Sequence, residues 1–432
     1  MEDYGIPTAP MATAHFANYM ARDSQIHGVP LRFSFPPHPT AWVSRETHRQ
    51  YVEGNDPITG RPLMQELIEV LTKPLTEGEK HPVALKRPRR PRLLTPDTED
   101  NLRRLFINNG WTDGLPIILP TEERVAEMLT GTDHNPQKVI GHMSVTPHEE
   151  KLEYTVEKVA VNAVMAGARP EHFPVILALA ATQRALIPSS TGSWAHMIVV
   201  NGPIRNEIGM NCGSSALSPF NFANSVIGRA GTLMSINFGD IVLSENFTGG
   251  AGNNFNYNNL CCGENQENSP WEPFHMQKGF KATDNTISLF RGWSMQGFSV
   301  GPPKRMAEMM IGLGFGNATF ILDPLVAKTL NKEGFKTKQE LSEFIAKEVK
   351  GFGQGGRPLA ADSINFIVVG GEWNPVFMTS DFVYLQTEPI DKWIPKNGIK
   401  MDKNPIRMPA QANCSEGVCG IPLNILDDEG KN

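Results

Sequence analysis

The sequence has no run of about eighteen apolar residues, so we expect no membrane-spanning helix. It has no surplus of basic residues either: 40 Lys and Arg against 46 Asp and Glu give a net charge of -6, which argues against a nucleic-acid-binding protein. The first residues, MEDYGIPTAP, lack the basic and apolar regions of a signal peptide. The 5 cysteines, at irregular spacing, do not fit a secreted disulfide framework. We therefore expect a cytoplasmic protein.

Some familiar catalytic motifs are missing as well. No HExxH sequence occurs, and the glycine spacing of the loop GMNCGSSALSP matches neither a Rossmann fingerprint nor a P-loop. This loop therefore provides no nucleotide-binding motif. The cofactor stays unknown from the sequence, with a transition metal ion as one candidate.

The N-terminal region, residues 1–96, is rich in proline, which fixes φ and removes a backbone donor. It is predicted to form an extended arm with one short helix at 62–71. Because the arm carries Phe33, Phe35 and Trp42, we expect it to dock on the body or on a neighbouring subunit. The arm therefore predicts a homo- or hetero-oligomer.

A basic segment, LKRPRRPRLL at 85–94, lies at the end of this arm. Its prolines exclude a helix, so the charges lie along an extended chain. The segment could bind an acidic partner or an anionic substrate. The alternative, which we favour, is a solvated linker or a contact between subunits.

Short apolar runs alternate with amphipathic segments from residue 97 onward. This alternation predicts an α/β protein with mostly parallel sheets, helices on both faces and two related lobes. We place the main α/β domain at 97–295, the second lobe at 296–400 and a C-terminal tail at 401–432. The predicted strands are TDGLPIILP, HMIVVNG, TISLFRG, ATFILD and INFIVVGG, and the later predicted helices are PKRMAEMMIGLG, PLVAKTLNKEG and KQELSEFIAKEV.

A loop rich in glycine and serine, GMNCGSSALSP, stands between a predicted strand and a predicted helix. Such a loop offers backbone N–H groups and the positive end of a helix dipole to an anion. Cys212 in this loop is a candidate nucleophile, or else a small cysteine beside a tight turn. The candidate substrate-binding residues are Gly209, Asn211, Gly213, Ser214 and Ser215, together with Glu372, which follows another strand.

The segment NNLCCGENQENSPWEPFH concentrates thiol, carboxylate and imidazole groups. Its candidate catalytic residues are Cys261, Cys262, Glu264, Glu267 and His275. A metal site is an alternative, and its candidate ligands are Cys262, Glu272 and His275, with His142 or His196 from elsewhere. A purely structural loop and a disulfide between the adjacent cysteines stay open too.

A second pair of cysteines, Cys414 and Cys419, lies near the C-terminus in NCSEGVCGIP. Their spacing is neither the CxxC redox spacing nor that of a zinc knuckle. The pair could shuttle electrons to a buried site, could form a disulfide, or could be incidental.

Several phrases of the chain, WTDGLP, VEKVAVNAVMAGARPEHFPVILA, NGPIRNEIGMNCG and ENQENSPWEPFH, resemble bacterial proteins related to the UGSC-type (seleno)protein families. The resemblance covers about residues 110–290. It implies an enzyme-like cytoplasmic protein associated with a reactive thiol or selenol, in its own chain or in a partner. It also matches Cys261 or Cys262 to a cysteine that precedes the ENQEN-like segment. The chain has no UGSC motif, and CSEGVC is the nearest sequence to it.

Together these patterns predict an enzyme that acts on a small polar or anionic substrate by thiol chemistry, and the resemblance favours redox chemistry. Cys212 or the Cys261–Cys262 pair would be the nucleophile, and the 209–215 loop would stabilise developing negative charge. One alternative is a metal-dependent hydrolase, hydratase or lyase. Another is a non-catalytic assembly subunit of a complex with a separate thiol- or selenol-bearing chain.

Overall fold

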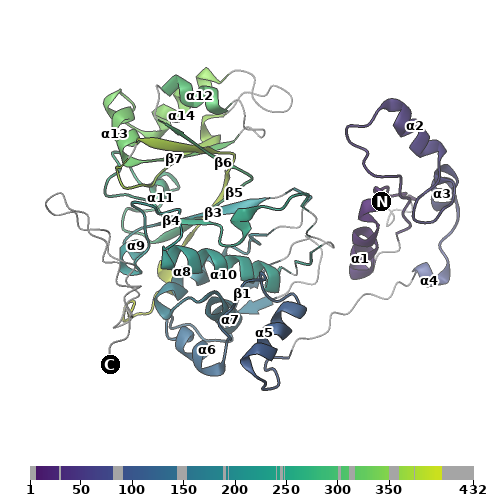
Figure 1. The fold of residues 1–432 in the computed structure, drawn as a ribbon, viewed down its shortest axis with the longest axis horizontal. Helices are drawn as coiled ribbons and strands as arrows, with labels where there is room; N and C mark the ends of the chain where they lie inside the picture. The colour runs from purple at the N-terminus through teal and green to yellow at the C-terminus, as the bar shows by residue number, and fades with distance from the viewer. Residues whose placement is uncertain are drawn as a thin grey trace, which may run out of the picture. The chain divides into compact units, whose positions relative to one another are not determined.

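The computed structural model describes residues 6–28, 31–80, 91–143, 153–187, 191–192, 194–239, 241–243, 247, 249–299, 303–310, 317–349, 360–373 and 375–400 (Figure 1). Residues 85–90 of the basic segment and the tail 401–432, with Cys414 and Cys419, lie outside the described residues. The chain divides into two compact units. The first contains Met1–Thr98, Ser144–Lys151 and Val242–Thr248, and the second contains the rest.

The first unit is built from short helices: η2 (Ala14–Phe16), α1 (Ala17–His27), α2 (Arg45–Glu53), α3 (Leu63–Thr72) and α4 (Glu77–Lys80). The sequence predicted only α3 among them. Side-chain hydrogen bonds are seen at the starts of α2 and α4. Ser44 Oγ accepts a hydrogen bond from Thr47 N over 3.0 Å at the start of α2. The buried carboxylate of Asp56 accepts bonds from Phe35 N over 2.6 Å and Ile58 N over 2.7 Å.

The second unit carries the longer helices. They are α5 (Glu99–Asn108), α6 (Glu122–Leu129), α7 (Val156–Ala166), α8 (Phe173–Ala181), α9 (Ile204–Glu207), α10 (Phe222–Phe238), α11 (Phe274–Gln277), α12 (Pro303–Met310), α13 (Pro324–Lys332) and α14 (Lys338–Glu348). Capping explains several boundaries. Thr155 caps α7, which ends at Gly167 with φ 86°, and a capping box of Thr337 and Glu340 opens α14. No described helix is long and apolar enough to cross a membrane.

The strands of the second unit form three sheets: β1 (Val139–His142) with β2 (Glu153–Thr155); β10 (Val383–Pro389), β5 (Thr286–Gly292), β3 (Ala195–Asn201) and β4 (Leu260–Gly263); and β6 (Met295–Ser299), β9 (Val376–Ser380), β7 (Ala318–Leu322) and β8 (Ile364–Val368). Only β3–β4 and β7–β8 are parallel among the described pairs. The mixed α/β class is confirmed. The prediction of mostly parallel sheets is wrong, because most described pairs are antiparallel.

The two four-stranded sheets repeat one arrangement and exchange one strand. Across each sheet, a parallel pair (β4–β3 or β8–β7) is extended by two more strands, β5 and β10 or β9 and β6, and each of these is antiparallel to the strand before it. β5 runs into β6, which pairs with β9 of the other sheet, and β9 runs into β10, which pairs with β5. Each sheet therefore borrows its edge strand from the neighbouring half of the chain.

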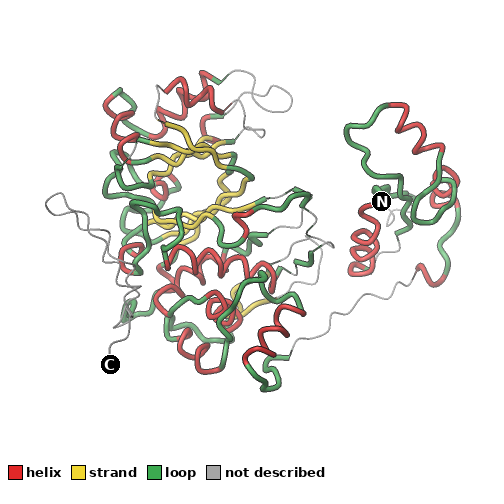
Figure 2. The backbone as a smooth tube through the Cα atoms, in the orientation of Figure 1, coloured by secondary structure: helices red, strands yellow, loops and turns green. Residues whose placement is uncertain are grey.

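The two sheets pack on each other, and each has helices on its other face (Figure 2). Met197 and Val199 of β3 meet Ile321 of β7 in the layer between the sheets. On the outer face of the second sheet, Phe320 packs with Leu341 of α14. The predicted helices on both faces of one sheet are therefore wrong. Strands covered by a sheet and by helices have the same continuous apolar sequence, so the sequence could not separate the two cases.

Candidate functional site

Cys212 lies in the loop between α9 and α10, where the carboxyl ends of β4 and β8 meet. Gly263 N donates to Asn211 O over 3.4 Å, and Gly370 N donates to Cys212 O over 3.1 Å. The Cys212 side chain is half-buried. Loops from both sheets therefore hold one thiol at an edge where α/β proteins commonly bind ligands.

Gly371 allows the loop after β8 to approach this thiol loop closely, and Gly370 allows the same loop to approach Asp323. A Cβ on Gly371 would lie 2.6 Å from Cβ of Ser214, and one on Gly370 would lie 2.4 Å from Oδ2 of Asp323. Gly370 also has φ 140°, in the region that favours glycine. The sequence placed Ser214 and Glu372 in separate candidate loops, and the structure brings these two loops into contact.

Arg205 of α9 is the charged group beside the thiol. Its Nη1 lies 3.6 Å from Cys212 Sγ, and its Nη2 donates to Glu267 Oε1 over 2.8 Å. The Arg205 side chain is only 2% exposed. Burial raises the pKa of the Cys212 thiol, the positive charge of Arg205 lowers it, and the negative charge of Glu267 raises it. The net pKa is above the ordinary value, so Cys212 rests as a protonated thiol.

Asparagine side chains fix the shape of the thiol loop. Asn211 N donates to Asn224 Oδ1 over 2.9 Å, and Asn211 Nδ2 donates to Asn221 Oδ1 over 2.8 Å. Gly213 N donates to Asn211 Oδ1 over 2.9 Å, so the backbone N–H of Gly213 is hydrogen-bonded within the loop. Ser215 has φ 56° and lies exposed at the far end of the loop. Gly209 lies earlier, in the turn after α9, with φ 68°.

Glu264 is a buried partner in an ion pair. Its carboxylate accepts from Lys338 Nζ over 2.7 Å, from Asn201 Nδ2 over 2.6 Å and from Phe274 N over 2.7 Å. Lys338 begins α14, so the pair joins an element after β4 to a helix beside the second sheet. Its three donors make Glu264 a fixed carboxylate. The carbonyl oxygen of the same residue accepts from Arg205 Nη1.

Glu267 and Glu372 occupy equivalent positions in the two repeats. Glu264 N donates to Val200 O over 3.1 Å after β4, and Val369 N donates to Leu322 O over 2.9 Å after β8. Glu264 and Val369 are therefore equivalent residues, each directly after the second strand of its parallel pair. The third residue after Glu264 is Glu267, and the third residue after Val369 is Glu372.

Each of these glutamates pairs with a cation from the helix that follows the first strand of its repeat. Arg205 of α9 pairs with Glu267, and Lys328 of α13 pairs with Glu372. Both ion pairs flank the thiol loop, because Glu372 directly follows the residues that contact Ser214. Glu267 is 54% exposed, which leaves its carboxylate accessible to solvent.

Cys261 and Cys262 point to opposite faces of β4, and neither forms a disulfide. The Cβ of Cys261 faces Gly228 of α10, where an added Cβ would lie 3.1 Å away. Cys262 belongs to the apolar layer between the sheets. Burial raises the pKa of Cys262 to about 12 and raises that of Cys261 well above its usual value. The disulfide considered from the sequence is absent because neighbouring residues of a strand face apart.

The candidate metal ligands are dispersed. His275 lies buried on α11 and donates from Nε2 to Lys281 O over 2.9 Å, while its Nδ1 has no partner among the described residues. His196, buried in β3, donates to Leu186 O over 2.7 Å. Glu272 is exposed, and His142 lies in β1. Within the described part of the chain, no three His, Cys, Asp or Glu side chains are placed to hold a metal.

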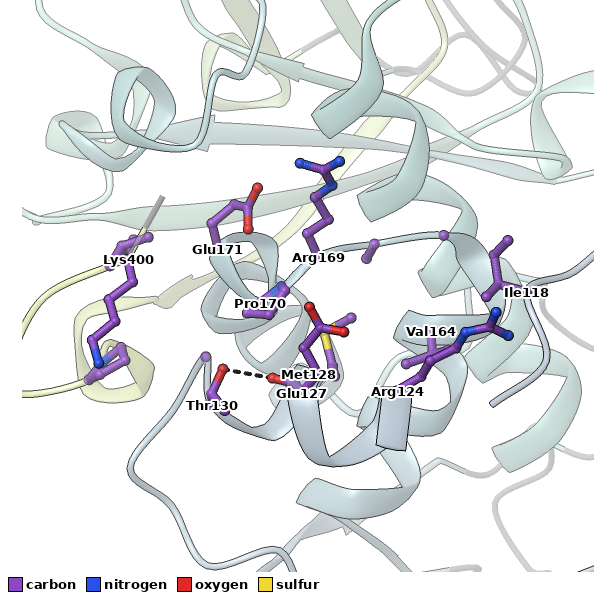
Figure 3. A pocket seen from close by; sticks show the side chains of 15 residues that line it. Ile118, Arg124, Glu127, Met128, Thr130, Val164, Arg169, Pro170, Glu171 and Lys400 are labelled. Carbon is purple, nitrogen blue, oxygen red and sulfur yellow. Dashed lines mark hydrogen bonds between the residues drawn. The ribbon is translucent and has the colours of Figure 1, made fainter. Parts of the chain in front are cut away.

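A separate pocket of about 430 Å³ lies beside α6 and the end of α7, and none of the candidate residues is part of its lining (Figure 3). Its charged lining consists of Arg124, Glu127, Arg169, Glu171 and Lys400. Cations and anions around one hollow could hold a small molecule with charges of both signs. The residues that line the pocket include no cysteine, serine or histidine, and we assign it no chemistry.

Sequence reasoning missed Arg205 and Lys338. Arg205 occurs in NGPIRNE within four residues of a strand end, a position that could have marked it. Nothing in the sequence distinguishes Lys338 from the other lysines of its helix. Comparisons of the chain with protein-family models, curated proteins and solved structures found no match.

Proposed function

We propose that the protein is an enzyme that acts on a small polar or anionic substrate through the thiol of Cys212. The observation that supports this most is the contact of 3.6 Å between Cys212 Sγ and Arg205 Nη1. The buried guanidinium lowers the pKa of this half-buried thiol and so offsets part of the effect of burial. This favours the thiolate, which is the nucleophilic form. The same positive charge favours the approach of an anionic substrate.

Cys212 is a better nucleophile than Cys261 or Cys262, because a reacting thiol needs access and a stabilising charge. Both cysteines of β4 are buried, and burial raises the pKa of each thiol. Ionisable groups raise it further: Cys212 and Glu264 act on Cys262, and Cys262 acts on Cys261. We therefore assign these two thiols to packing.

Glu267 is the candidate general acid or base of the proposed site. It shares Arg205 with Cys212, and its carboxylate is accessible to solvent. Glu264 is held by three donors, and burial lowers the pKa of His275, so both suit structural roles. The 211–215 loop and Glu372 would contact the substrate from two sides. Redox chemistry is favoured over hydrolysis by the resemblance alone.

The experiment that tests this function measures which thiol reacts in the native protein. A variant with Cys414→Ser and Cys419→Ser is treated with iodoacetamide, and the modified cysteines are mapped by mass spectrometry over time. We expect Cys212 to be alkylated long before Cys261 and Cys262. Faster alkylation of either β4 cysteine in the folded protein would contradict the proposal.

A second arm separates the enzyme from an assembly subunit. The native protein is incubated with small electrophilic and disulfide-containing compounds, and turnover is compared with that of Cys212→Ala. Loss of turnover in this variant supports the proposal. Turnover that persists unchanged without Cys212 would favour a nucleophile on a separate chain.

A further inference from the structure

Asp323 is a buried carboxylate that directly follows β7 and is only 7% exposed. Its Oδ1 accepts a hydrogen bond from Leu325 N over 2.9 Å and so caps α13. Its Oδ2 accepts a hydrogen bond from Glu372 N over 3.1 Å. One oxygen therefore serves a helix and the other serves the loop after β8. A carboxylate suits this position because both of its oxygens are acceptors.

The loop after β8 has a backbone shape that needs support. Gly370 has φ 140° and Glu372 has φ 65°. A glutamate takes a positive φ only at an energetic cost, and such conformations persist where the surrounding structure holds them. A Cβ on Gly370 would lie 2.4 Å from Oδ2 of Asp323, so the loop lies directly against this carboxylate. Asp323 therefore supports the shape of residues 370–372.

The same loop holds the thiol loop through its backbone. Gly370 N donates to Cys212 O over 3.1 Å, and a Cβ on Gly371 would lie 2.6 Å from Cβ of Ser214. Asn265 Nδ2 donates to Gly370 O over 2.8 Å and gives the loop a second support, from the first repeat. A movement of residues 370–372 is therefore passed on to Cys212.

Arg205 is held in place by different contacts. Its Nε donates to Gly202 O over 2.9 Å, and its Nη2 donates to Glu267 Oε1 over 2.8 Å. The loop after β8 takes part in neither bond. The distance of 3.6 Å between Arg205 Nη1 and Cys212 Sγ therefore depends on where the thiol loop lies. Because the guanidinium lowers the pKa of the thiol, this distance affects how readily Cys212 ionises.

The first repeat has a different residue at the position of Asp323. Val200 and Leu322 are equivalent, because the carbonyl oxygen of each accepts from the residue that directly follows the second strand of its parallel pair. The residues after them, Asn201 and Asp323, are therefore equivalent too. Asn201 Nδ2 donates to Glu264 Oε2 over 2.6 Å, so the fold does not require a carboxylate at this position.

We propose that Asp323 is a positioning residue for Cys212. Its carboxylate holds the loop after β8, this loop holds the thiol loop, and the thiol is thereby kept beside Arg205. The ionisation of a thiol in the first repeat thus depends on a carboxylate of the second repeat. The inference rests on the proposed function only in taking Cys212 as the reacting thiol.

The test measures the pKa of the Cys212 thiol in Asp323→Asn. Rates of alkylation by iodoacetamide are followed across pH in the full chain with Cys414→Ser and Cys419→Ser. Asparagine caps helices as well as aspartate does, but its side chain has one acceptor oxygen, so one of the two bonds is lost without loss of volume. We expect the thiol pKa to rise by about half a unit or more, which slows alkylation about threefold at neutral pH. Asp323→Ala should give a larger rise.

Asp381→Ala is the matched control for Asp323→Ala. Asp381 is also buried, at 6% exposed, and it accepts backbone bonds from Trp293 N over 2.7 Å and Ser294 N over 2.9 Å. It lies against Gly292, which pairs with the first residue of β3, at the end of the strand away from the thiol loop. Urea unfolding should show that both alanine variants are destabilised, whereas only Asp323→Ala should raise the thiol pKa.

A double variant tests whether the effect passes through Arg205. In Arg205→Gln the charge beside the thiol is gone, so the addition of Asp323→Asn should cause no further shift of the thiol pKa.

Three results would overturn the proposal. They are an unchanged thiol pKa in Asp323→Asn and Asp323→Ala, an equal rise in Asp381→Ala, and shifts that add in full in the double variant. The measurements need no substrate, so these results differ from failure of the proposed function, which would appear as turnover that persists in Cys212→Ala.

Discussion

Gly370 N donates a hydrogen bond of 3.1 Å to the carbonyl oxygen of Cys212. This bond joins the loop after β8 to the loop that carries the thiol, across the boundary between the two repeats. The position of Cys212 therefore depends on backbone from both halves of the second unit. Changes in the loop after β8 should alter the reactivity of the Cys212 thiol through the backbone.

Gly371→Ala should disturb both stability and thiol reactivity. The added Cβ would lie 2.6 Å from Cβ and 2.8 Å from N of Ser214, so one loop must move. We expect a loss of about 1–3 kcal/mol in the free energy of unfolding, as for other overpacked sites, and a changed alkylation rate at Cys212. Urea unfolding and alkylation kinetics measure the two effects. Gly250→Ala is the control, since an added Cβ there meets nothing within 4 Å.

The two charges near Cys212 should shift its pKa in opposite directions. Glu267→Gln removes a negative charge that raises the pKa, so the thiol should ionise at lower pH and react faster at neutral pH. Arg205→Gln removes the charge that lowers the pKa, so alkylation should slow down. At a pH below the pKa of the thiol, a change of one unit in that pKa changes the thiolate fraction roughly tenfold. Alkylation rates measured across pH give the pKa of Cys212 in each variant. Shifts of this pKa in the same direction in the two variants would contradict the electrostatic account.

The buried pair of Lys338 and Glu264 should be costly to break from one side. Lys338→Met leaves a carboxylate without its countercharge at a fully buried position. We expect a loss of about 3–5 kcal/mol in the free energy of unfolding. The double variant with Glu264→Gln should recover part of that loss, because it removes the unpaired charge. Urea unfolding of the single and double variants checks this, and additive losses would argue against direct pairing.

Acid should destabilise the protein through His196. Burial lowers the pKa of His196 to about 3, from an ordinary value of 6.5. Below pH 6.5 the unfolded chain binds a proton that the folded chain refuses, so stability falls as the pH drops from about 6.5 towards 3. His196→Asn keeps a donor for Leu186 O and should flatten this dependence between pH 7 and 4. His142→Asn, at a position that is not buried, is the control, and equal slopes would refute the assignment.

The sequence predicted local elements better than their pairing. The runs that became β3, β5, β7 and β8 and the helices α12, α13 and α14 were identified from apolar periodicity and caps. TDGLPIILP was predicted as a strand and forms none, because its two prolines interrupt pairing. LCCG was read as a loop segment and forms β4. The exchange of β6 and β10 between the sheets cannot be read from a local sequence pattern, because it depends on strands that pair across about 100 residues.

The candidate site was predictable only in part. Cys212 stood out as a thiol in a glycine-rich loop before a helix, and Glu267 as a carboxylate in a polar segment. Their shared contact with Arg205 depends on the chain turning back after β4. Cys261 and Cys262 drew attention as neighbours in sequence, yet strand geometry separates them. Adjacency in sequence therefore does not place the two thiols on the same face of the strand.

The exchange of strands between the two sheets also bears on the order in which the molecule is made. β5 gains its outer neighbour β10 only after residue 389 has been synthesised, about 100 residues later. Until then, a nascent chain displays a bare strand edge to other chains translated from the same message. Slow translation after β5 should therefore favour intertwined products, and a fast return of β10 should favour correctly closed single chains.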